Sequence, residues 1–218
     1  MMEVPPDDAG VARLIRDCYD QIAERYMADV TRSGPHARFD WVDRFCQQLE
    51  PASEVVDVGC GPGVPTTASL VAAGHAVMGV DLSPRQIALA SRNVPGAQFT
   101  VGDVLTIDVE EASIDGVLML YVITHVPRDR HAAVLERIHR WIRPGGSLLL
   151  TFGTKDSPAW LEEDFLGYGV NSWTNGWAPE RSVSLVEGAG FTIKRADRVR
   201  SEEPSGREEW LWVLAHRE

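Results

Sequence analysis

Short apolar segments alternate with amphipathic ones along most of the chain. Five segments have the composition of buried strands, over residues 53–59, 75–81, 97–103, 114–122 and 147–153. Helical patterns separate most of them, over residues 66–74, 84–93 and 129–142. Strands that are apolar throughout and alternate with helices are typical of a parallel sheet covered by helices on both faces. The sequence therefore predicts an α/β fold.

Both ends of the chain depart from this alternation. Near the carboxyl end, residues 190–200 and 209–217 have strand patterns separated only by the polar "SEEPSGRE", a connection that suits an antiparallel pair. We therefore expect a seven-stranded mixed sheet whose last strand is antiparallel and whose first and fourth strands are neighbours. Ahead of the sheet, residues 9–30 and 38–49 have helical patterns. These helices form either a lid over one end of the sheet or a layer on one of its faces.

Composition excludes several classes of partner. The 218 residues carry a formal net charge of −11, which disfavours binding to nucleic acid or to an anionic membrane surface. No apolar run approaches the roughly 20 residues of a membrane-spanning helix, and "MMEVPPDDAGVARL" lacks the features of a signal peptide. The three cysteines, Cys18, Cys46 and Cys60, are widely spaced and odd in number, so we expect a reduced, cytoplasmic protein. We expect a metal-free site, because no ligand cluster has convincing spacing.

A glycine-rich turn follows the first strand. The stretch "VVDVGCGPG" places Gly59, Gly61 and Gly63 on alternate residues, with Asp57 just before them. Glycine allows the backbone to turn tightly and to approach a ligand closely. The spacing is GxGxG, whereas the usual dinucleotide fingerprint is GxGxxG. A tight turn with a purely structural role remains the alternative for this motif on its own.

Aspartates close the next two strands. Asp81 ends "VMGVD", where its carboxylate can accept hydrogen bonds from both hydroxyls of a ribose. Asp103 ends "FTVGD", where its carboxylate can accept from the exocyclic amine of an adenine. Each residue alone is explained as well by a turn or a helix cap. Because ligands of open parallel sheets bind at the carboxyl ends of the strands, the glycine turn and the two aspartates together predict an adenosine pocket.

The same residues resemble a known family. The segments "VVDVGCGPG", "VMGVDLSPRQIALA", "FTVGDVLTID", "IDGVLMLYVITHVP" and "IRPGGSLLLTFG" are similar, in this order, to the motifs of class I S-adenosylmethionine-dependent methyltransferases. The end of the chain is similar to a bacterial small-molecule branch, in which "DWLGxxMYWSHF" is frequent, but this sequence has "TN" where "SH" would stand. The resemblance implies a Rossmann-like fold in one domain. Residues 1–50 would form an N-terminal helical lid, 53–153 the donor-binding core, and 154–218 the acceptor-side insertion and C-terminal strands.

The resemblance also implies roles for individual residues. The methionyl group of S-adenosylmethionine would pass the glycine turn, with Asp57 near its ammonium, and Asp81 would bind the ribose. Asp103 and Val104 would hold the adenine edge, with Leu82 on its ring and Leu120 beside the donor. A "YDxxAxxY" helix lies over the donor in this family. Here it reads "YDQIAERY", so Tyr26 is a donor contact and Tyr19 an acceptor contact, although either ring would equally serve as a core residue.

Candidates for chemistry and for acceptor binding follow the fourth and fifth strands. His125, in "YVITHVP", has the ordinary pKa of a base near neutrality, and Tyr121 has a weaker claim; a strand-terminating role is the alternative for His125. We expect His131 and His139 to face solvent. Residues 156–179 are rich in aromatics that would form an apolar wall for a small acceptor, or that plug a long connection. These aromatics are Trp160, Phe165, Tyr168, Trp173 and Trp177.

The sequence thus favours a methyltransferase that transfers a methyl group from S-adenosylmethionine to an oxygen or nitrogen of a small molecule, leaving S-adenosylhomocysteine. In-line displacement at an activated donor needs mainly proximity and alignment, with a histidine base where the acceptor must lose a proton. We expect a monomer or homodimer. A nicotinamide-dependent oxidoreductase and a non-catalytic adenosylmethionine-binding protein are the alternatives.

Overall fold

The computed structural model describes residues 7–32, 37–203 and 206–218. Residues 1–6 and 33–36, which belong to the predicted helical lid, lie outside the described residues. So do residues 204–205, which belong to the predicted polar connection between the two tail strands.

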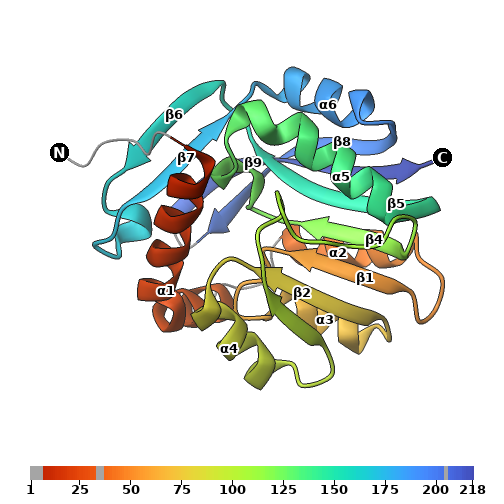
Figure 1. Ribbon diagram of the computed structural model, residues 1–218, viewed down its shortest axis with the longest axis horizontal. Coiled ribbons are helices and arrows are strands. Elements are labelled where there is room, and N and C mark those ends of the chain that lie inside the picture. The colour runs from red at the N-terminus through yellow and green to blue at the C-terminus, as the bar shows by residue number, and fades with distance from the viewer. Residues whose placement is uncertain (1–6, 33–36, 204–205) are drawn as a thin grey trace.

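The main sheet has seven strands in the order β3-β2-β1-β4-β5-β9-β8 (Figure 1). The strands are β1 (Glu54–Val58), β2 (Ala76–Asp81), β3 (Gln98–Val101), β4 (Ile114–Met119), β5 (Ile142–Gly153), β8 (Phe191–Glu203) and β9 (Gly206–Arg217). The first five are parallel, β1 pairs with β4, and β9 runs antiparallel to both of its neighbours. These observations confirm the predicted seven-stranded mixed sheet.

The last strand, β9, is antiparallel as expected, but it lies inside the sheet and β8 forms the edge. Helix α6 (Pro179–Gly188) precedes β8, so this connection returns the chain parallel to β5. The hairpin that follows then brings β9 back into the space between β5 and β8. Strand β5 also begins earlier than expected, because Ile142 already pairs with Ile114 before a register shift at the "RPGG" segment.

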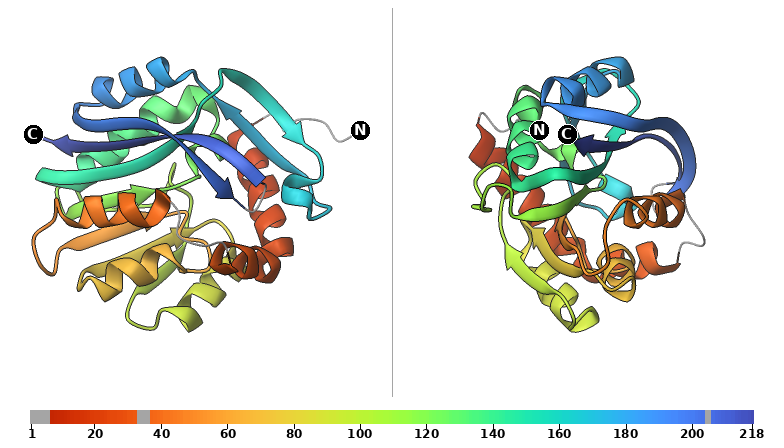
Figure 2. Two further views of the ribbon diagram at one scale, coloured as in Figure 1. Left: turned by 180° about the vertical axis from the view of Figure 1, so that it is seen from behind. Right: turned by 90° about the vertical axis from the view of Figure 1, so that its right-hand side faces the viewer.

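Helices cover both faces of the sheet. The remaining helices are α1 (Asp8–Arg32), α2 (Ala37–Cys46), α3 (Thr66–Ala72), α4 (Pro84–Asn93) and α5 (His131–Trp141). Alternate strand residues supply two separate cores: Val56 and Val117 pack on the α5–α6 side, whereas Val55 and Leu118 pack with α2 and α3. Figure 2 shows α2 and α3 on the side opposite to α5 and α6. Burial on both faces explains why the central strands carry no polar alternation.

The two N-terminal helices occupy different places. Helix α2 packs on a sheet face, whereas α1 lies across the carboxyl ends of the parallel strands (Figure 1). Asp20 of α1 binds the start of α4, where it accepts from the Ser83 hydroxyl and from the Arg85 backbone N–H at 3.1 Å. The Arg85 side chain also pairs with Glu24 of α1. Of the two arrangements that the sequence allowed, α1 therefore covers the strand ends and α2 forms part of a layer.

The segment between β5 and α6 forms a small sheet of its own, which the sequence analysis did not predict. Strand β6 (Ser157–Glu162) pairs antiparallel with β7 (Ser172–Gly176), and a short 3₁₀ turn, η3 (Phe165–Gly167), lies between them. This β6–β7 insertion lies beside α1 (Figure 1). It therefore stands over the same strand ends as α1.

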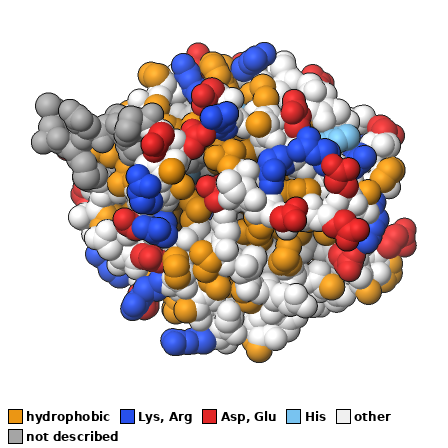
Figure 3. Space-filling model, viewed as in Figure 1, with side chains coloured by type: hydrophobic (Ala, Val, Ile, Leu, Met, Phe, Trp, Pro, Cys, Tyr) orange, Lys and Arg blue, Asp and Glu red, His pale blue; other side chains and the backbone are white. Residues whose placement is uncertain are grey.

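The surface and the helices agree with the composition. Figure 3 shows acidic and basic side chains interspersed with hydrophobic ones on one face of the molecule. Among the helices that the structure describes, none combines the length and the apolar character needed to cross a membrane.

Candidate active site

Three adjacent cavities, which share some of their lining residues, lie at the carboxyl ends of the strands. The first, which we call the strand-end cavity, is lined by the ends of β1, β2 and β4, by residues 102–105 and by α1. The second, the glycine-turn cavity, lies under Gly59–Gly61 and beside Asp57 and Arg38. The third, the insertion cavity, lies between the β6–β7 insertion, α1 and β9.

The glycine turn needs glycine at these positions. Gly59, Gly61 and Gly63 have φ values of +69°, +53° and +75°, a region that side-chain-bearing residues rarely adopt. A Cβ atom at Gly59 would also lie 2.1 Å from Cγ2 of Val122. The backbone N–H of Gly59 donates to the carbonyl of Val80 at 2.7 Å, which fixes the turn against β2. The turn therefore exposes bare backbone to the cavities on both sides.

Asp81 joins the glycine turn to the start of α4. Its two carboxylate oxygens accept from the backbone N–H groups of Gly61 and Ser83, each at 2.9 Å. Desolvation by burial raises the pKa of Asp81 to about 6, although these two hydrogen bonds oppose the increase. Because each carboxylate oxygen has two lone-pair sites, Asp81 keeps capacity to accept from a ligand.

The other predicted residues of the strand-end cavity surround Asp81. Asp103 accepts from the backbone N–H of Leu105 at 2.8 Å, which shapes the turn after β3. Leu82, Val104 and Leu120 supply apolar wall. The structure thus brings together the aspartates of two strand ends and apolar side chains on both sides of them, although they are far apart in the sequence.

Asp57 and Arg38 place opposite charges in the glycine-turn cavity. Asp57 is buried and accepts from the Thr67 hydroxyl at 2.6 Å. Burial raises the pKa of Asp57 to about 7, partly opposed by Thr67. The sequence analysis did not single out either Thr67 or Arg38, the two residues beside Asp57. Arg38 could have been found, because it occupies a core-facing position of α2, three and four residues before Trp41 and Val42. Tyr26 closes this cavity opposite Gly61.

Tyr19 and His125 form a hydrogen-bonded pair where the strand-end and insertion cavities meet. His125 lies in the 3₁₀ turn η1 (Ile123–His125), and its Nδ1 is 2.8 Å from the carbonyl oxygen of Trp173. A carbonyl only accepts, so Nδ1 carries the proton in the neutral ring and Nε2 is free to accept. The Tyr19 hydroxyl lies 3.1 Å from Nε2 and therefore donates to it. Burial lowers the pKa of His125 and raises the pKa of Tyr19, so both are neutral near pH 7.

Tyr121 lines all three cavities. It follows β4 with a positive φ of 62°, and its N–H donates to the Thr151 hydroxyl at 2.7 Å. The guanidinium of Arg38 lies 4.8 Å from the ring centre, and Trp210 meets the ring edge-on. Contacts with Arg38 and Trp210 therefore hold the Tyr121 ring in place between the three cavities.

The insertion cavity has a volume of about 570 Å³, within the range of small-molecule sites. Trp160 and Phe165 of the predicted aromatic wall line it, and so does Trp210 of β9, which the sequence analysis did not single out. Glu162 was also missed. The alternation of "AWLE" along β6 could have revealed it, because Trp160 and Glu162 share one face of a strand.

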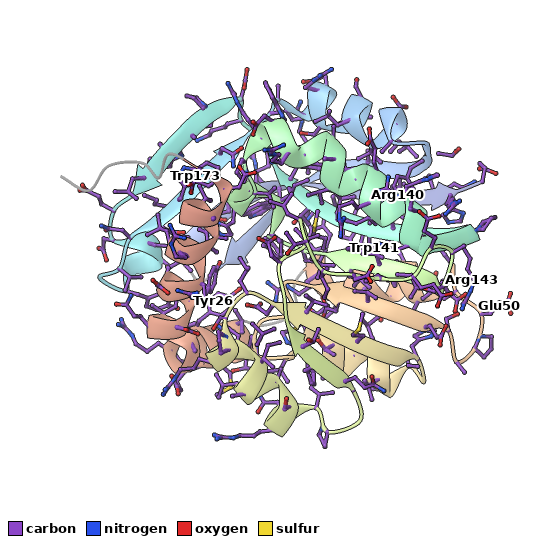
Figure 4. All side chains as sticks on the ribbon, in the orientation of Figure 1. Tyr26, Glu50, Arg140, Trp141, Arg143 and Trp173 are labelled. Atoms are coloured by element: carbon purple, nitrogen blue, oxygen red, sulfur yellow. The ribbon has the colours of Figure 1, made fainter. Side chains whose placement is uncertain are left out.

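The other three aromatics of the insertion lie outside this cavity. Trp173 pairs with Leu161 on the opposite strand face, is buried against Val11 and Ile15, and lies near the first turns of α1 (Figure 4). Tyr168 donates to Asp29 at 2.5 Å. Trp177 donates from its indole nitrogen to the carbonyl of Arg128 at 3.1 Å. These three rings fix the insertion to α1 and to the loop before α5.

Two further expectations concern histidines and metals. His131, expected at the surface, is instead buried, because its Nε2 donates to the carbonyl of Val126 at 3.0 Å at the start of α5. His139 is partly buried and meets Phe191 edge-on. Within residues 7–32, 37–203 and 206–218 there is no group of three or more His, Cys, Asp or Glu side chains that could hold a metal ion.

Comparison with known proteins identifies the fold and the motif region. Residues 55–146 match the model of a family described as a methyltransferase domain. Trans-aconitate 2-methyltransferase of Methylobacterium nodulans is 37% identical over 46% of this chain, and the chain spans only 38% of its length. Carboxy-S-adenosyl-L-methionine synthase of Aeromonas hydrophila is 30% identical over 69% of this chain and 66% of its own length. The chain belongs to the class I S-adenosylmethionine-dependent methyltransferases.

A solved methyltransferase structure has the same architecture over nearly the whole chain. The 1,6-didemethyltoxoflavin-N1-methyltransferase of Burkholderia thailandensis, with bound 1,6-didemethyltoxoflavin and S-adenosylhomocysteine, has a TM-score of 0.76 at 24% identity. The match covers 99% of this chain and 93% of that one. The methyltransferase fold therefore extends beyond the motif region, to α1, the insertion and the C-terminal strands.

Proposed function

We propose that this protein transfers a methyl group from S-adenosylmethionine to an oxygen or nitrogen atom of a small molecule. The observation that carries the proposal is that neighbouring cavities share lining residues. Tyr26 and Tyr121 line all three cavities, and Tyr19 and His125 line both the strand-end and the insertion cavity. A donor in the first two cavities and an acceptor in the third would meet at this junction. Alignment of the two reactants there is worth about 7–11 kcal/mol of the barrier.

The charges of the first two cavities fit each part of the donor. Asp81 would accept from the ribose hydroxyls, and Asp103 with the backbone of Val104 would bind the adenine edge. The methionyl end carries an ammonium and a carboxylate, and the glycine-turn cavity offers Asp57 and Arg38 for these two charges. Tyr26 lies over Gly61 and would cover the donor chain at this point.

The same geometry suggests how a proton would leave the acceptor. In the neutral state Nε2 of His125 accepts from Tyr19, so the Tyr19 oxygen is the atom of this pair that retains acceptor capacity. A hydroxyl or N–H of the acceptor would donate to Tyr19 while Tyr19 passes its own proton to His125. An acceptor that already carries a free lone pair would need no such relay.

The remaining expectations about cellular context stay part of the proposal. The formal charge of −11 and the three free cysteines support a reduced, cytoplasmic enzyme that binds neither nucleic acid nor a membrane. The volume of the insertion cavity supports a small-molecule substrate. We propose a monomer or homodimer.

Calorimetric titration tests the donor half of this proposal. S-adenosylhomocysteine should bind, whereas NAD and NADP at the same concentrations should not. Formation of S-adenosylhomocysteine from S-adenosylmethionine, screened against pools of small hydroxyl and amine compounds, tests catalysis. Binding of NAD in preference to S-adenosylhomocysteine would overturn the assignment, and donor binding without turnover of any acceptor would favour a non-catalytic binding protein.

A further inference from the structure

The insertion cavity contains a carboxylate that the protein itself does not neutralise. Glu162, at the end of β6, is partly buried in the cavity wall, and its carboxylate has no hydrogen bond or ion pair with any residue that the structure describes. Burial raises the pKa of Glu162, and the nearby charge of Glu208 adds to the increase. A carboxylate in this setting gains from a positive partner, because burial and a like charge both penalise its ionised form.

The basic side chains of the cavity wall do not supply that partner. Arg200 pairs with Glu209 at 2.9 Å. Arg38 lines both the insertion cavity and the glycine-turn cavity, and its guanidinium lies over the ring of Tyr121. Lys155 is exposed at the cavity margin. None of these three side chains therefore forms an ion pair with Glu162, although the wall contains charges of both signs.

A second hydrogen-bond acceptor in the same wall is independent of these carboxylates. Asn175 is only 3% exposed, and its Nδ2 donates to the carbonyls of Thr124 and Val126, each at 2.8 Å. Two carbonyl partners fix the orientation of the amide, because only its NH₂ group can donate. Among the described residues nothing donates to Oδ1, and a buried acceptor without a donor is destabilising. Asn175 thus adds a buried acceptor without a donor to the residues that line this cavity.

Aromatic rings stand around these acceptors. Trp160 shares the strand face of Glu162 and is 48% exposed toward the cavity mouth. Phe165 meets both Tyr19 and His125 edge-on, at the inner end of the cavity. Ring faces attract cations and bind flat apolar groups. The wall therefore suits a molecule with an apolar body and a positively charged donor group.

We propose that the methyl acceptor is an organic cation with a flat apolar body and an N–H-bearing charged nitrogen, and that Glu162 binds this nitrogen. This inference rests on the function proposed above, because it takes the insertion cavity as the acceptor site. Glu162 would act as a specificity-determining residue. The aromatic rings would hold the apolar body toward the junction at Tyr19 and His125.

Binding to the protein loaded with S-adenosylhomocysteine tests the proposal by calorimetry near neutral pH. The probes are tryptamine, phenethylamine and benzylamine, each compared with a carboxylate on the same ring: indole-3-propionate, 3-phenylpropionate and phenylacetate. At least one amine should bind more tightly than its carboxylate partner. Glu162→Gln should weaken the binding of that amine about tenfold or more, which is the effect expected from loss of a charge-assisted hydrogen bond. Glu163→Gln, which alters the exposed neighbouring carboxylate, should leave the affinity unchanged.

Two outcomes would overturn the proposal: no amine binds at millimolar concentration, or Glu162→Gln leaves amine binding unchanged. S-adenosylhomocysteine affinity, measured in the same three proteins, separates this failure from failure of the proposed function. If the donor product binds normally and the amines show no preference, only the acceptor class is wrong. If the donor product does not bind to the wild-type protein, the methyltransferase proposal itself fails.

Discussion

At the scale of single residues, the role proposed for Asp57 predicts that donor binding depends on pH. Its pKa is about 7 in the folded protein and about 4 when unfolded. Between these values the folded chain holds a proton that the unfolded chain has released. The contribution of Asp57 to the free energy of unfolding therefore falls as pH rises through this window. A bound ammonium favours the carboxylate instead, so donor binding should expel the proton.

We accordingly expect S-adenosylhomocysteine to bind more tightly as pH rises from about 5 to about 7, with release of protons. Titration calorimetry in buffers of different ionisation enthalpy measures that release. Asp57→Asn should reduce it, leaving a smaller part from Asp81, whose pKa is about 6. The exposed Asp108→Asn is the matched control and should change nothing. Equal proton release in wild type and Asp57→Asn would show that the ammonium does not lie near Asp57.

The Tyr19–His125 pair gives a second prediction at this scale. For an acceptor whose attacking atom carries a proton, His125→Ala should lower turnover by roughly 10²–10⁴, while S-adenosylhomocysteine affinity holds. Burial keeps the pKa of His125 below its ordinary value, so wild-type turnover should stay level near neutrality and fall only as pH decreases through that lower pKa.

Tyr19→Phe distinguishes a proton relay from simple packing, because it keeps the ring and removes the hydroxyl. Turnover should again fall with donor affinity retained. Tyr168→Phe removes a hydroxyl that bonds Asp29 outside the cavities, and it should have little effect on turnover. Full activity of Tyr19→Phe across the pH range would leave alignment as the mechanism.

At the scale of elements, the glycine turn makes a prediction that a matched glycine sharpens. Gly59 and Gly74 both have positive φ, but a Cβ at Gly74 would meet nothing within 4 Å. Gly59→Ala adds overpacking against Val122, so it should cost about 1–3 kcal/mol more than Gly74→Ala in the free energy of unfolding. Urea denaturation of both variants measures the difference. Equal costs would mean that Val122 moves aside and that the turn is adaptable.

Sequence patterns predict elements well where burial on both faces dictates them. The strands that carry Asp57 and Asp81 are apolar throughout and end at turns, so their carboxyl ends could be placed from the sequence. The β6–β7 insertion has no such constraint, because one strand face meets α1 and the other a cavity. Trp160 and Trp173 therefore look equivalent in sequence but point to opposite faces. The direction of a side chain there depends on strand pairing with residues that a linear pattern does not reveal.

Buried polar residues on helices are the second group of residues that sequence patterns did not predict. Arg38 and His131 are polar residues that are buried on their helices, and the sequence analysis did not predict their burial. In the fold, Arg38 stands beside Asp57 and Tyr121, and His131 donates to a loop carbonyl ahead of α5. Each is buried because the fold supplies a polar or aromatic neighbour, and for Arg38 these neighbours are distant in the sequence.

At the scale of the whole molecule, the proposed donor site lies between α1 and the main sheet. The strand-end cavity has α1 on one side and four strand ends on the other. A ligand there would connect the N-terminal helix to the sheet. Because such a ligand binds the folded state alone, it should stabilise the entire fold by mass action, by about 2.7 kcal/mol at a hundredfold excess over Kd.

For a chain of 218 residues, that increment should raise Tm by roughly 5–11 °C. Thermal unfolding with S-adenosylhomocysteine, and with NAD as the comparison, measures the shift. Hydrogen exchange shows where the ligand stabilises the fold. Amide exchange should slow as strongly in α1 as in the glycine turn, because the ligand would contact a tyrosine of α1, Tyr19 or Tyr26, as well as Gly59 and Gly61. Protection of the turn without protection of α1 would mean that the helix is not part of the donor site. The cavity would then bind its ligand from the sheet side alone.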